Sequence, residues 1–200
     1  MVRAILDGRK TQTRRVVKPQ PEGIRALHWG ECQPLGGFGA DIFLEDGSII
    51  KCPYGMIKDQ LWVRETYQPI YADGWDGGVN PDGSGDMVDF KTGYGYAPSY
   101  PATDGIVEFY DMNKDDISQR VWPSIHMPRW ASRIQLEITG IRVERLQDIS
   151  EADAIAEGVD SSLYEKTYRY GYSKIWESIN GENSWDANPC VWVIEFKRIR

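Results

Sequence analysis

Alternation of apolar and polar residues predicts strands at several places along the chain. From Arg133 to Leu146 the alternation changes phase at Thr139-Gly140, which indicates a β-bulge or a tight turn. Val191 to Ile199 predicts a closing strand, and Leu61 to Tyr67 is strand-like. The segment 42–52 predicts a hairpin, because an Asp-Gly pair separates two apolar runs.

Helix start and stop signals lie between these strands. Met1 to Leu6 predicts the end of a short helix that stops at Gly8. Ser150 begins another, with Asp153 three residues later as in a capping box and Gly158 at its end. A further helix is predicted over Ser162 to Ile179. With about six strands and three helices in an order that is not a βαβ repeat, we expect an α+β barrel.

One long stretch, Gln68 to Gln119, has no clear period. It is rich in Gly, Tyr, Asp and Pro, and only Gly105 to Tyr110 has strand character. Irregular stretches of this length inside a compact domain are usually lids, binding loops or insertions. We therefore predict a single domain over residues 1–200 with an insertion at about 68–120.

Cysteine usage and hydropathy exclude several classes of protein. The three cysteines are odd in number and form no Cys-x-x-Cys pair, and His28 and His126 do not fall at ligand spacing from them. We therefore expect no disulfide framework, no metal site and no cofactor. No long apolar run occurs, so we expect a cytoplasmic protein without membrane contact.

Charge is spread unevenly along the chain. A net charge of −7 argues against a protein that coats nucleic acid duplexes, whose affinity comes from neutralising phosphates. The first 18 residues nevertheless carry six basic side chains against one acid, Asp7. This distribution predicts a local anion site on an acidic body.

The basic segment Gly8 to Arg15 carries the candidate chemistry. Neighbouring positive charges and partial burial would lower the pKa of Lys10, so that it could act as a base. A turn-like backbone would place Thr13 on the same side, and a hydroxyl beside an amine base is a minimal nucleophile pair. Arg9, Arg14 and Arg15 could bind a phosphate or polarise a carbonyl.

Aromatic residues beside cations form weaker candidates. Arg129 and Trp130 could supply a cation and a stacking face for a base, with His126 nearby in the sequence. Strand alternation places Arg64 on the face of Trp62, and there we favour an internal Arg64 paired with a carboxylate. Asp59 is expected to form a turn.

Three stretches of sequence resemble the ASCH domain family, which has a PUA-like fold. They are an Ile-Leu-Asp-Gly-Arg-Lys-Thr-x-Thr-x-Arg opening at 5–15, Lys-Asp-Gln-Leu-Trp-Val-Arg-Glu at 58–65 and Val-Ile-Glu-Phe at 193–196. With the segment 122–130, the whole chain is similar to uncharacterised proteins of bacteriophages and prophages. The resemblance implies a small PUA-like (ASCH) β-barrel with peripheral helices and a phage-encoded protein in a bacterial host.

One branch of this family implies a reaction. Small bacterial amidohydrolases that remove the acetyl group from N4-acetylcytidine use a lysine base, a threonine nucleophile and a glutamate proton donor. By motif these match Lys10, Thr13 and Glu157. The resemblance therefore implies an amidohydrolase that acts on an N4-acylated cytosine nucleoside or a related modified base.

The chain departs from the family pattern at two places. The family's Gly-Asp turn is Lys58-Asp59 here, so the tight turn lacks its glycine. Relatives also carry a short strand before the first helix, whereas this sequence begins at Met1 within that helix. We expect either an open barrel edge or another segment that fills it.

Two other functions remain open at this point. The chain could be a non-catalytic RNA-binding or RNA-processing module, in which the basic segment contacts phosphate and an aromatic residue stacks a base. It could also be a phage accessory protein that binds a host protein through the aromatic insertion. A nuclease ranks lower, because the sequence has no metal cluster and no paired histidines.

Overall fold

The computed structural model describes residues 1–32, 37–71, 96–106, 109–111, 116–118, 121–160 and 167–200. The chain divides into two compact units, each of which is described by itself. The first consists mainly of Arg3–Leu61 and Leu136–Ile199, and the second mainly of Trp62–Gln135. The second unit contains the predicted insertion at about 68–120.

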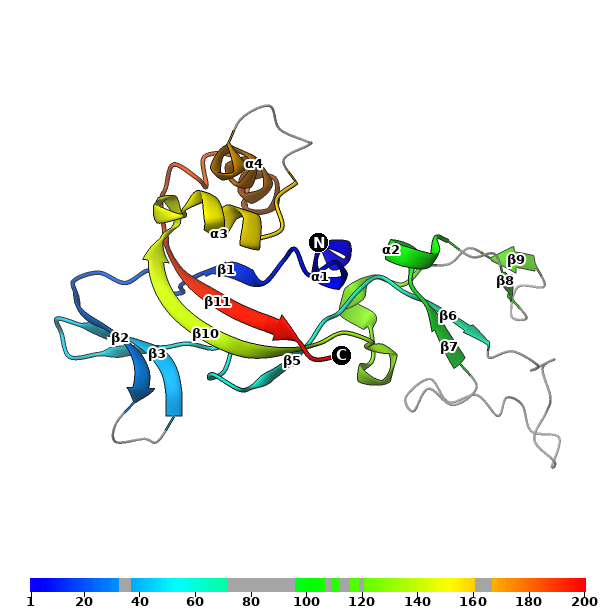
Figure 1. The fold of residues 1–200 in the computed structure, drawn as a ribbon, viewed down its shortest axis with the longest axis horizontal. Helices are drawn as coiled ribbons and strands as arrows, with labels where there is room; N and C mark the ends of the chain where they lie inside the picture. Colours follow the sequence, from blue (N-terminus) through cyan, green and yellow to red (C-terminus); the bar gives the residue numbers. More distant parts are fainter. Residues whose placement is uncertain (33–36, 72–95, 107–108, 112–115, 119–120, 161–166) are drawn as a thin grey trace. The chain divides into compact units, whose positions relative to one another are not determined.

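The first unit is built on a four-stranded antiparallel half-barrel (Figure 1). Its strand order is β1 (Gln12–Val16), β11 (Cys190–Arg198), β10 (Gln135–Arg145) and β5 (Gln60–Trp62). The predicted bulge is confirmed, because the register between β10 and β11 shifts between Ile138 and Gly140. β1 lies at an edge of this sheet.

A second sheet in this unit has the order β2 (Ile24–Cys32), β3 (Gly37–Leu44) and β4 (Ile49–Lys51). The β3–β4 pair is the predicted hairpin, whereas the sequence did not predict β2. Apolar side chains of both sheets form one buried cluster. Its members are Val17, Ile42, Ile138, Ile141, Val143, Cys190, Trp192 and Ile194.

The opposite face of the half-barrel is covered by helices (Figure 1). α1 (Val2–Leu6), the 3-10 turn η3 (Leu146–Asp148), α3 (Glu151–Ala156) and α4 (Tyr168–Asn180) belong to this unit. The predicted capping box of α3 is confirmed. α4 begins after a Thr167 cap rather than at Ser162, and residues 162–166 of that prediction lie outside the described residues.

The second cluster of buried side chains joins these helices to the sheet. It includes the neighbours Val191 and Val193 of β11 together with Tyr172 and Trp176, which lie one turn apart on α4. Burying side chains of this size stabilises the contact by roughly 1.5–3 kcal/mol each. The helices are therefore fixed on the sheet by an apolar contact.

The second unit contains more strands than the sequence predicted. β6 (Gln68–Tyr71) pairs with β7 (Tyr96–Ser99), and β8 (Phe109–Asp111) pairs with β9 (Asp116–Ser118). α2 (Pro101–Asp104) and the 3-10 turns η1 (Ser124–His126) and η2 (Arg129–Ala131) complete it. The described residues of the whole chain thus form eleven strands rather than about six. β6 and β7 are rich in Pro, Ser and Tyr and show no apolar alternation, which is why this pair was missed. The strand character predicted for Gly105 to Tyr110 overlaps β8, and residues 107–108 lie outside the described residues.

The predicted strand Leu61 to Tyr67 is too long. β5 ends at Trp62, although burial still alternates beyond it, with Arg64 and Thr66 exposed and Glu65 buried. Glu65 is bound by Arg133 through two hydrogen bonds of 2.9 Å. The expectation of an internal Arg64 was therefore wrong, because Arg64 is exposed and the next residue, Glu65, is the buried member of an ion pair.

The turn before β5 takes the shape that a glycine would favour. Lys58 has a φ of 77°, in the left-handed region that non-glycine residues rarely adopt. Asp59 stabilises the turn, since its carboxylate accepts a hydrogen bond of 2.8 Å from the Met56 N–H. The expectation that Asp59 forms a turn is confirmed, and the tight turn persists without its glycine.

Candidate functional site

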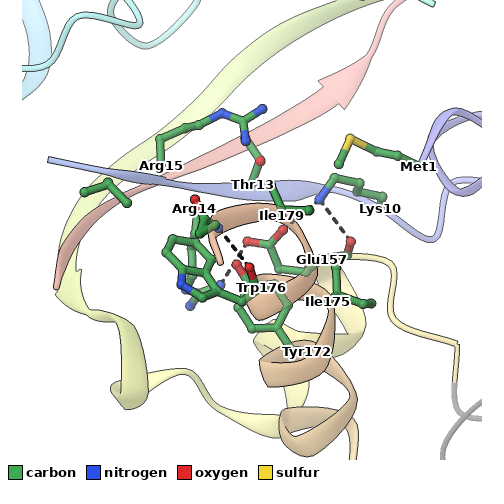
Figure 2. A pocket seen from close by; sticks show the side chains of 12 residues that line it. Met1, Lys10, Thr13, Arg14, Arg15, Glu157, Tyr172, Ile175, Trp176 and Ile179 are labelled. Carbon is green, nitrogen blue, oxygen red and sulfur yellow. Dashed lines mark hydrogen bonds and ion pairs between the residues drawn. The ribbon is translucent and has the colours of Figure 1, made fainter. Parts of the chain in front are cut away.

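Strand parity decides where the basic side chains at the start of the chain point. Gln12 to Val16 is a β-strand, so Gln12 and Arg14 share one face, and Thr13 and Arg15 share the other. Figure 2 shows Arg14 directed towards α4 and Arg15 directed away from it. The expectation of a turn-like backbone at Thr13 was therefore wrong, because Thr13 lies within a strand and Lys10 lies just before it.

Lys10 lies just before this strand, between two helices. Its N–H donates to the carbonyl of Ala4 at 2.8 Å, and the N–H of Thr11 donates to the carbonyl of Ala156 at 2.8 Å. Lys10 and Glu157 also form an isolated antiparallel bridge. These backbone contacts fix Lys10 against the end of α3, where Glu157 is the C-terminal cap.

Gly158 makes this close approach possible. It has a φ of 84°, and a Cβ atom at this position would lie 3.0 Å from the Cβ of Lys10. A glycine can adopt this backbone conformation, and its lack of a Cβ atom leaves room for the Lys10 side chain. The helix-ending glycine that the sequence indicated also sets the distance between Lys10 and Glu157.

The Lys10 ammonium makes three hydrogen bonds, all within the protein. Nζ donates to the Gln12 carbonyl at 2.8 Å, to the Glu157 carbonyl at 2.9 Å and to Glu157 Oε2 at 2.7 Å. Both side chains of the ion pair are only 4% exposed. Burial lowers the pKa of the Lys10 amine, the contacts with Glu157 oppose this, and the charges of Arg15 and Arg14 add to the lowering. The predicted direction of the pKa shift and the meeting of Lys10 with Glu157 are both found.

Arg14 binds the other oxygen of the Glu157 carboxylate. Its side chain is fully buried, with Nη1 3.3 Å from Glu157 Oε1 and Nη2 3.0 Å from Glu144 Oε2. Asp153 lies 3.4 Å from the same Nη2, and the ring of Tyr172 lies 5.9 Å from the guanidinium carbon. The charge of Arg14 is balanced by carboxylates inside the protein, and its predicted contact with substrate stays a prediction.

These side chains belong to a larger ionic network on the helix-covered face of the sheet. Arg14 and Arg142 both lie opposite Val193, one on each side of β11. Arg142 binds Glu144, Glu195 and Asp153, the last at 2.8 Å. Sequence analysis missed Arg142 and Glu144 as partners, although their spacing of two residues on a predicted strand indicates a shared face.

A cavity of about 90 Å³ opens beside this network (Figure 2). Lys10, Thr13, Arg15 and Glu157 line it, which brings the three predicted catalytic residues to one cavity. Its apolar wall comes mainly from α4. That wall consists of Tyr172, Ile175, Trp176 and Ile179. The indole N–H of Trp176 is buried and has no hydrogen-bond partner among the described residues.

The remaining basic residues of the segment differ in their surroundings. Arg15 is exposed at the cavity, and no ion pair joins it to a carboxylate among the described residues. Arg9 is also exposed, but it pairs with Asp7 at 3.2 Å and does not line the cavity. Arg15 is thus an exposed cation at the cavity, whereas Lys10 and Arg14, which also line it, are buried.

Arg129 and Trp130 belong to the second unit. Trp130 packs against a buried cluster that contains Tyr67 and Tyr100, so it serves the core of this unit. Arg129 is exposed, and its guanidinium carbon lies 5.8 Å from the centre of the Trp62 ring.

Within the described ranges, no group of three or more His, Cys, Asp or Glu side chains is arranged to hold a metal ion. No helix in the described part of the chain is both long and apolar enough to span a bilayer. Comparison with protein-family models, curated proteins and solved structures found no match. The resemblance to ASCH domains therefore stays a prediction that rests on the quoted motifs.

Proposed function

We propose that this protein is an amidohydrolase of the ASCH type, with a PUA-like barrel, that removes the acyl group from an N4-acylated cytosine nucleoside or a related modified base. One observation carries the proposal: a buried Lys10–Glu157 pair lies at a cavity that Thr13 also lines. Amide hydrolysis by a hydroxyl nucleophile needs a base for the hydroxyl and an acid for the leaving nitrogen. The pair can supply both.

The hydrogen bond between Lys10 and Glu157 supports the assignment of a base and an acid to this pair. An ammonium with a carboxylate contains the same number of protons as a neutral amine with a carboxylic acid. Burial disfavours charged forms, so a substrate that displaces water from the cavity favours the neutral pair. In that state Lys10 is a base and Glu157 is an acid, with no proton gained from or lost to solvent.

Acylation of Thr13 then proceeds with a balanced transfer of protons. The neutral Lys10 amine takes the proton of the Thr13 hydroxyl while Oγ1 attacks the acyl carbonyl carbon. As the bond from this carbon to N4 breaks, the Glu157 carboxylic acid donates its proton to N4. The products are an acyl ester of Thr13, free cytosine nucleoside and the Lys10–Glu157 ion pair.

Hydrolysis of the ester restores the starting state. The Glu157 carboxylate takes a proton from water while the water oxygen attacks the ester carbon. The Lys10 ammonium returns its proton to Oγ1 of Thr13 as the carboxylic acid leaves. Each residue thus acts once in each direction, as microscopic reversibility of the two steps requires.

The surrounding side chains have supporting roles in this proposal. Arg14 is a positioning residue, because it binds the Glu157 oxygen that does not face Lys10. Tyr172 and Trp176 offer an aromatic wall against which a pyrimidine ring can pack. The exposed Arg15 is placed for the polar end of the substrate.

The test is turnover of N4-acetylcytidine by the purified chain and by matched variants. Thr13→Val removes the nucleophile with little change in shape, and Thr11→Val makes the same change at an exposed position two residues away. We expect Thr13→Val and Lys10→Met to lower kcat/KM by a factor of at least about 10² and Thr11→Val to leave it unchanged. Absence of turnover by the unmodified protein, or equal rates for the two threonine variants, would remove the proposal.

A further inference from the structure

Two buried N–H groups at the cavity have no hydrogen-bond partner among the described residues. They are Nε of Arg14 and Nε1 of Trp176, and both residues line the cavity. The Arg14 side chain is fully buried, and Trp176 is only 5% exposed. A buried indole N–H usually has a partner, because a buried donor without one is unfavourable. Both groups therefore favour a ligand that brings a hydrogen-bond acceptor into the cavity.

The chemistry of these two atoms restricts the kind of ligand. An indole nitrogen and a guanidinium nitrogen donate hydrogen bonds and accept none. The carboxylate that lines the cavity, that of Glu157, is already bound at both of its oxygens, by Lys10 and by Arg14. The unsatisfied groups of the buried wall are thus donors, and a carbonyl oxygen is the ligand atom that matches them.

Trp176 is held in place before any ligand binds. It lies one turn from Tyr172 on α4, with the two ring centres 6.2 Å apart. Both rings belong to the buried cluster that contains Val191 and Val193 of β11. A donor that is already fixed loses little freedom when its hydrogen bond forms. Its N–H lies in the plane of the indole, so an acceptor meets the edge of this ring.

Strand parity indicates which carbonyl of an acylated cytosine reaches Trp176, and this step rests on the proposed function. The acyl carbonyl must lie at Thr13, on the face of β1 that is turned away from Arg14. The leaving nitrogen must lie at Glu157, whose carboxylate is 3.3 Å from Nη1 of Arg14, and Arg14 is directed towards α4 (Figure 2). The pyrimidine ring attached to that nitrogen therefore lies on the α4 side of β1, and its carbonyl oxygen is O2.

We propose that Trp176 is a specificity-determining residue, which donates a hydrogen bond from Nε1 to the ring carbonyl oxygen O2 of a cytosine derivative. The cavity then selects pyrimidines with an oxygen at position 2. A ring without this acceptor leaves the indole N–H buried and unsatisfied, which weakens its binding.

The experiment compares two nucleosides that differ in one atom, N4-acetylcytidine and N4-acetyl-2-thiocytidine. Sulfur is a weak acceptor, so the change weakens the proposed hydrogen bond. Calorimetric titration of the Thr13→Val protein, which lacks the proposed nucleophile, measures both dissociation constants without turnover. We expect the oxygen compound to bind more tightly by a factor of about 5–10, and this ratio to fall below about 2 when Trp176→Phe is added. The ratio of two ligands on one variant cancels the packing that the smaller ring loses.

A matched control lies beside the cavity wall. The ring of Trp185 packs at 6.3 Å from that of Tyr172, but Trp185 does not line the cavity. Trp185→Phe makes the same change in size and is expected to retain the ratio. Nuclear magnetic resonance adds a readout that needs no change at Trp176. Its indole proton should move downfield when N4-acetylcytidine is added, and less with the 2-thio analogue.

The possible outcomes either support or overturn the role of Trp176. A preference for the oxygen compound that is lost in Trp176→Phe and retained in Trp185→Phe supports it. An equal ratio with and without Trp176→Phe, an indole proton that does not move, or no binding of N4-acetylcytidine overturns it. Turnover with an unchanged ratio overturns this role alone, whereas the expected ratio without turnover by the unmodified protein overturns the proposed hydrolysis alone.

Discussion

Arg14 provides a sharp test of the ionic network, because its neighbour on the strand is a natural control. Arg14→Met keeps most of the apolar stem and removes a fully buried charge that contacts Glu144, Asp153 and Glu157. Arg15→Met makes the identical change at an exposed position on the other face of β1. The two variants therefore differ only in what surrounds the side chain.

The expected size of the effect follows from the remaining partners. Removing one partner of a buried ion pair typically destabilises a protein by about 3–5 kcal/mol. Lys10 still binds Glu157, and Arg142 still binds Glu144 and Asp153, so we expect the lower end, about 3 kcal/mol. For a chain of this length this corresponds to a fall in Tm of roughly 6–12 °C. Arg15→Met is expected to change the free energy of unfolding by less than about 0.5 kcal/mol.

The pH dependence adds a second readout. Burial opposes ionisation of Asp153, but the hydrogen bond from Ser150 and the charge of Arg14 outweigh it, so its pKa lies below the ordinary value. A carboxyl group with a lowered pKa stabilises the fold above its unfolded-state pKa, and this contribution is lost as the pH falls through its folded-state pKa. The difference between the unmodified protein and Arg14→Met is thus largest near neutral pH and shrinks below about pH 4.

Urea denaturation followed by circular dichroism, at neutral and acidic pH, measures both quantities. Equal stabilities of Arg14→Met and Arg15→Met at neutral pH would refute the assignment of Arg14 to a buried structural role. A difference between the two variants that grows towards acidic pH would contradict the electrostatic explanation of that role.

Two further predictions concern backbone conformation. Gly158→Ala places a Cβ atom 3.0 Å from the Cβ of Lys10 at a positive φ, whereas the Cβ of Gly8→Ala, at a φ of 72°, has nothing within 4 Å. Thermal denaturation should show both variants to be less stable than the unmodified protein. Gly158→Ala should lose about 1–3 kcal/mol more than Gly8→Ala. Lys58→Gly relieves the left-handed conformation of Lys58 and should stabilise the chain by about 0.5–1 kcal/mol; a lower urea midpoint for this variant would contradict the strained turn.

The sequence predicted elements best where one pattern dominated. The bulge in β10 was visible because apolar alternation changed phase at Thr139-Gly140, and the capping box was visible as Ser150 with Asp153. β11 was visible from a run of apolar residues. In each case a local signal agreed with the tertiary contacts, which is the condition under which sequence reasoning succeeds.

β1 was harder to predict because its buried face is polar. Both buried side chains are polar and have polar partners: Gln12 donates to the backbone carbonyl of Asp153, and Arg14 binds carboxylates. The strand therefore shows no hydrophobic alternation. For the same reason, the sequence did not show that Thr13 and Arg14 lie on opposite faces of β1. Tyr172 and Trp176 were not recognised as cavity walls, since helical spacing alone does not show which partner a helix covers.

The sequence predicted only some of the contacts at the candidate site. The meeting of Lys10 with Glu157 came from the family resemblance, whereas residue spacing gave no reason to join positions so far apart. Nothing in the local sequence distinguished buried Arg14 from exposed Arg15, because burial here depends on carboxylates from β10 and α3. Most of the predicted insertion, including residues 72–95, lies outside the described residues.

The central claim is that Thr13 is the nucleophile and that Glu157 is needed to release the acyl group. Glu157→Gln removes the charge that raises the pKa of Lys10 and leaves burial and two arginines that lower it, so the substitution favours the neutral, basic form of Lys10. With p-nitrophenyl acetate, whose leaving group needs no proton, this variant should be acetylated and then hydrolysed slowly.

Mass spectrometry of the quenched Glu157→Gln protein, with peptide mapping, tests this claim most directly. The account predicts one acetyl group on Thr13, and its absence when Thr13→Val is added to the same variant. An acetyl group elsewhere that persists in the double variant, or no acetylation at all, would contradict the account.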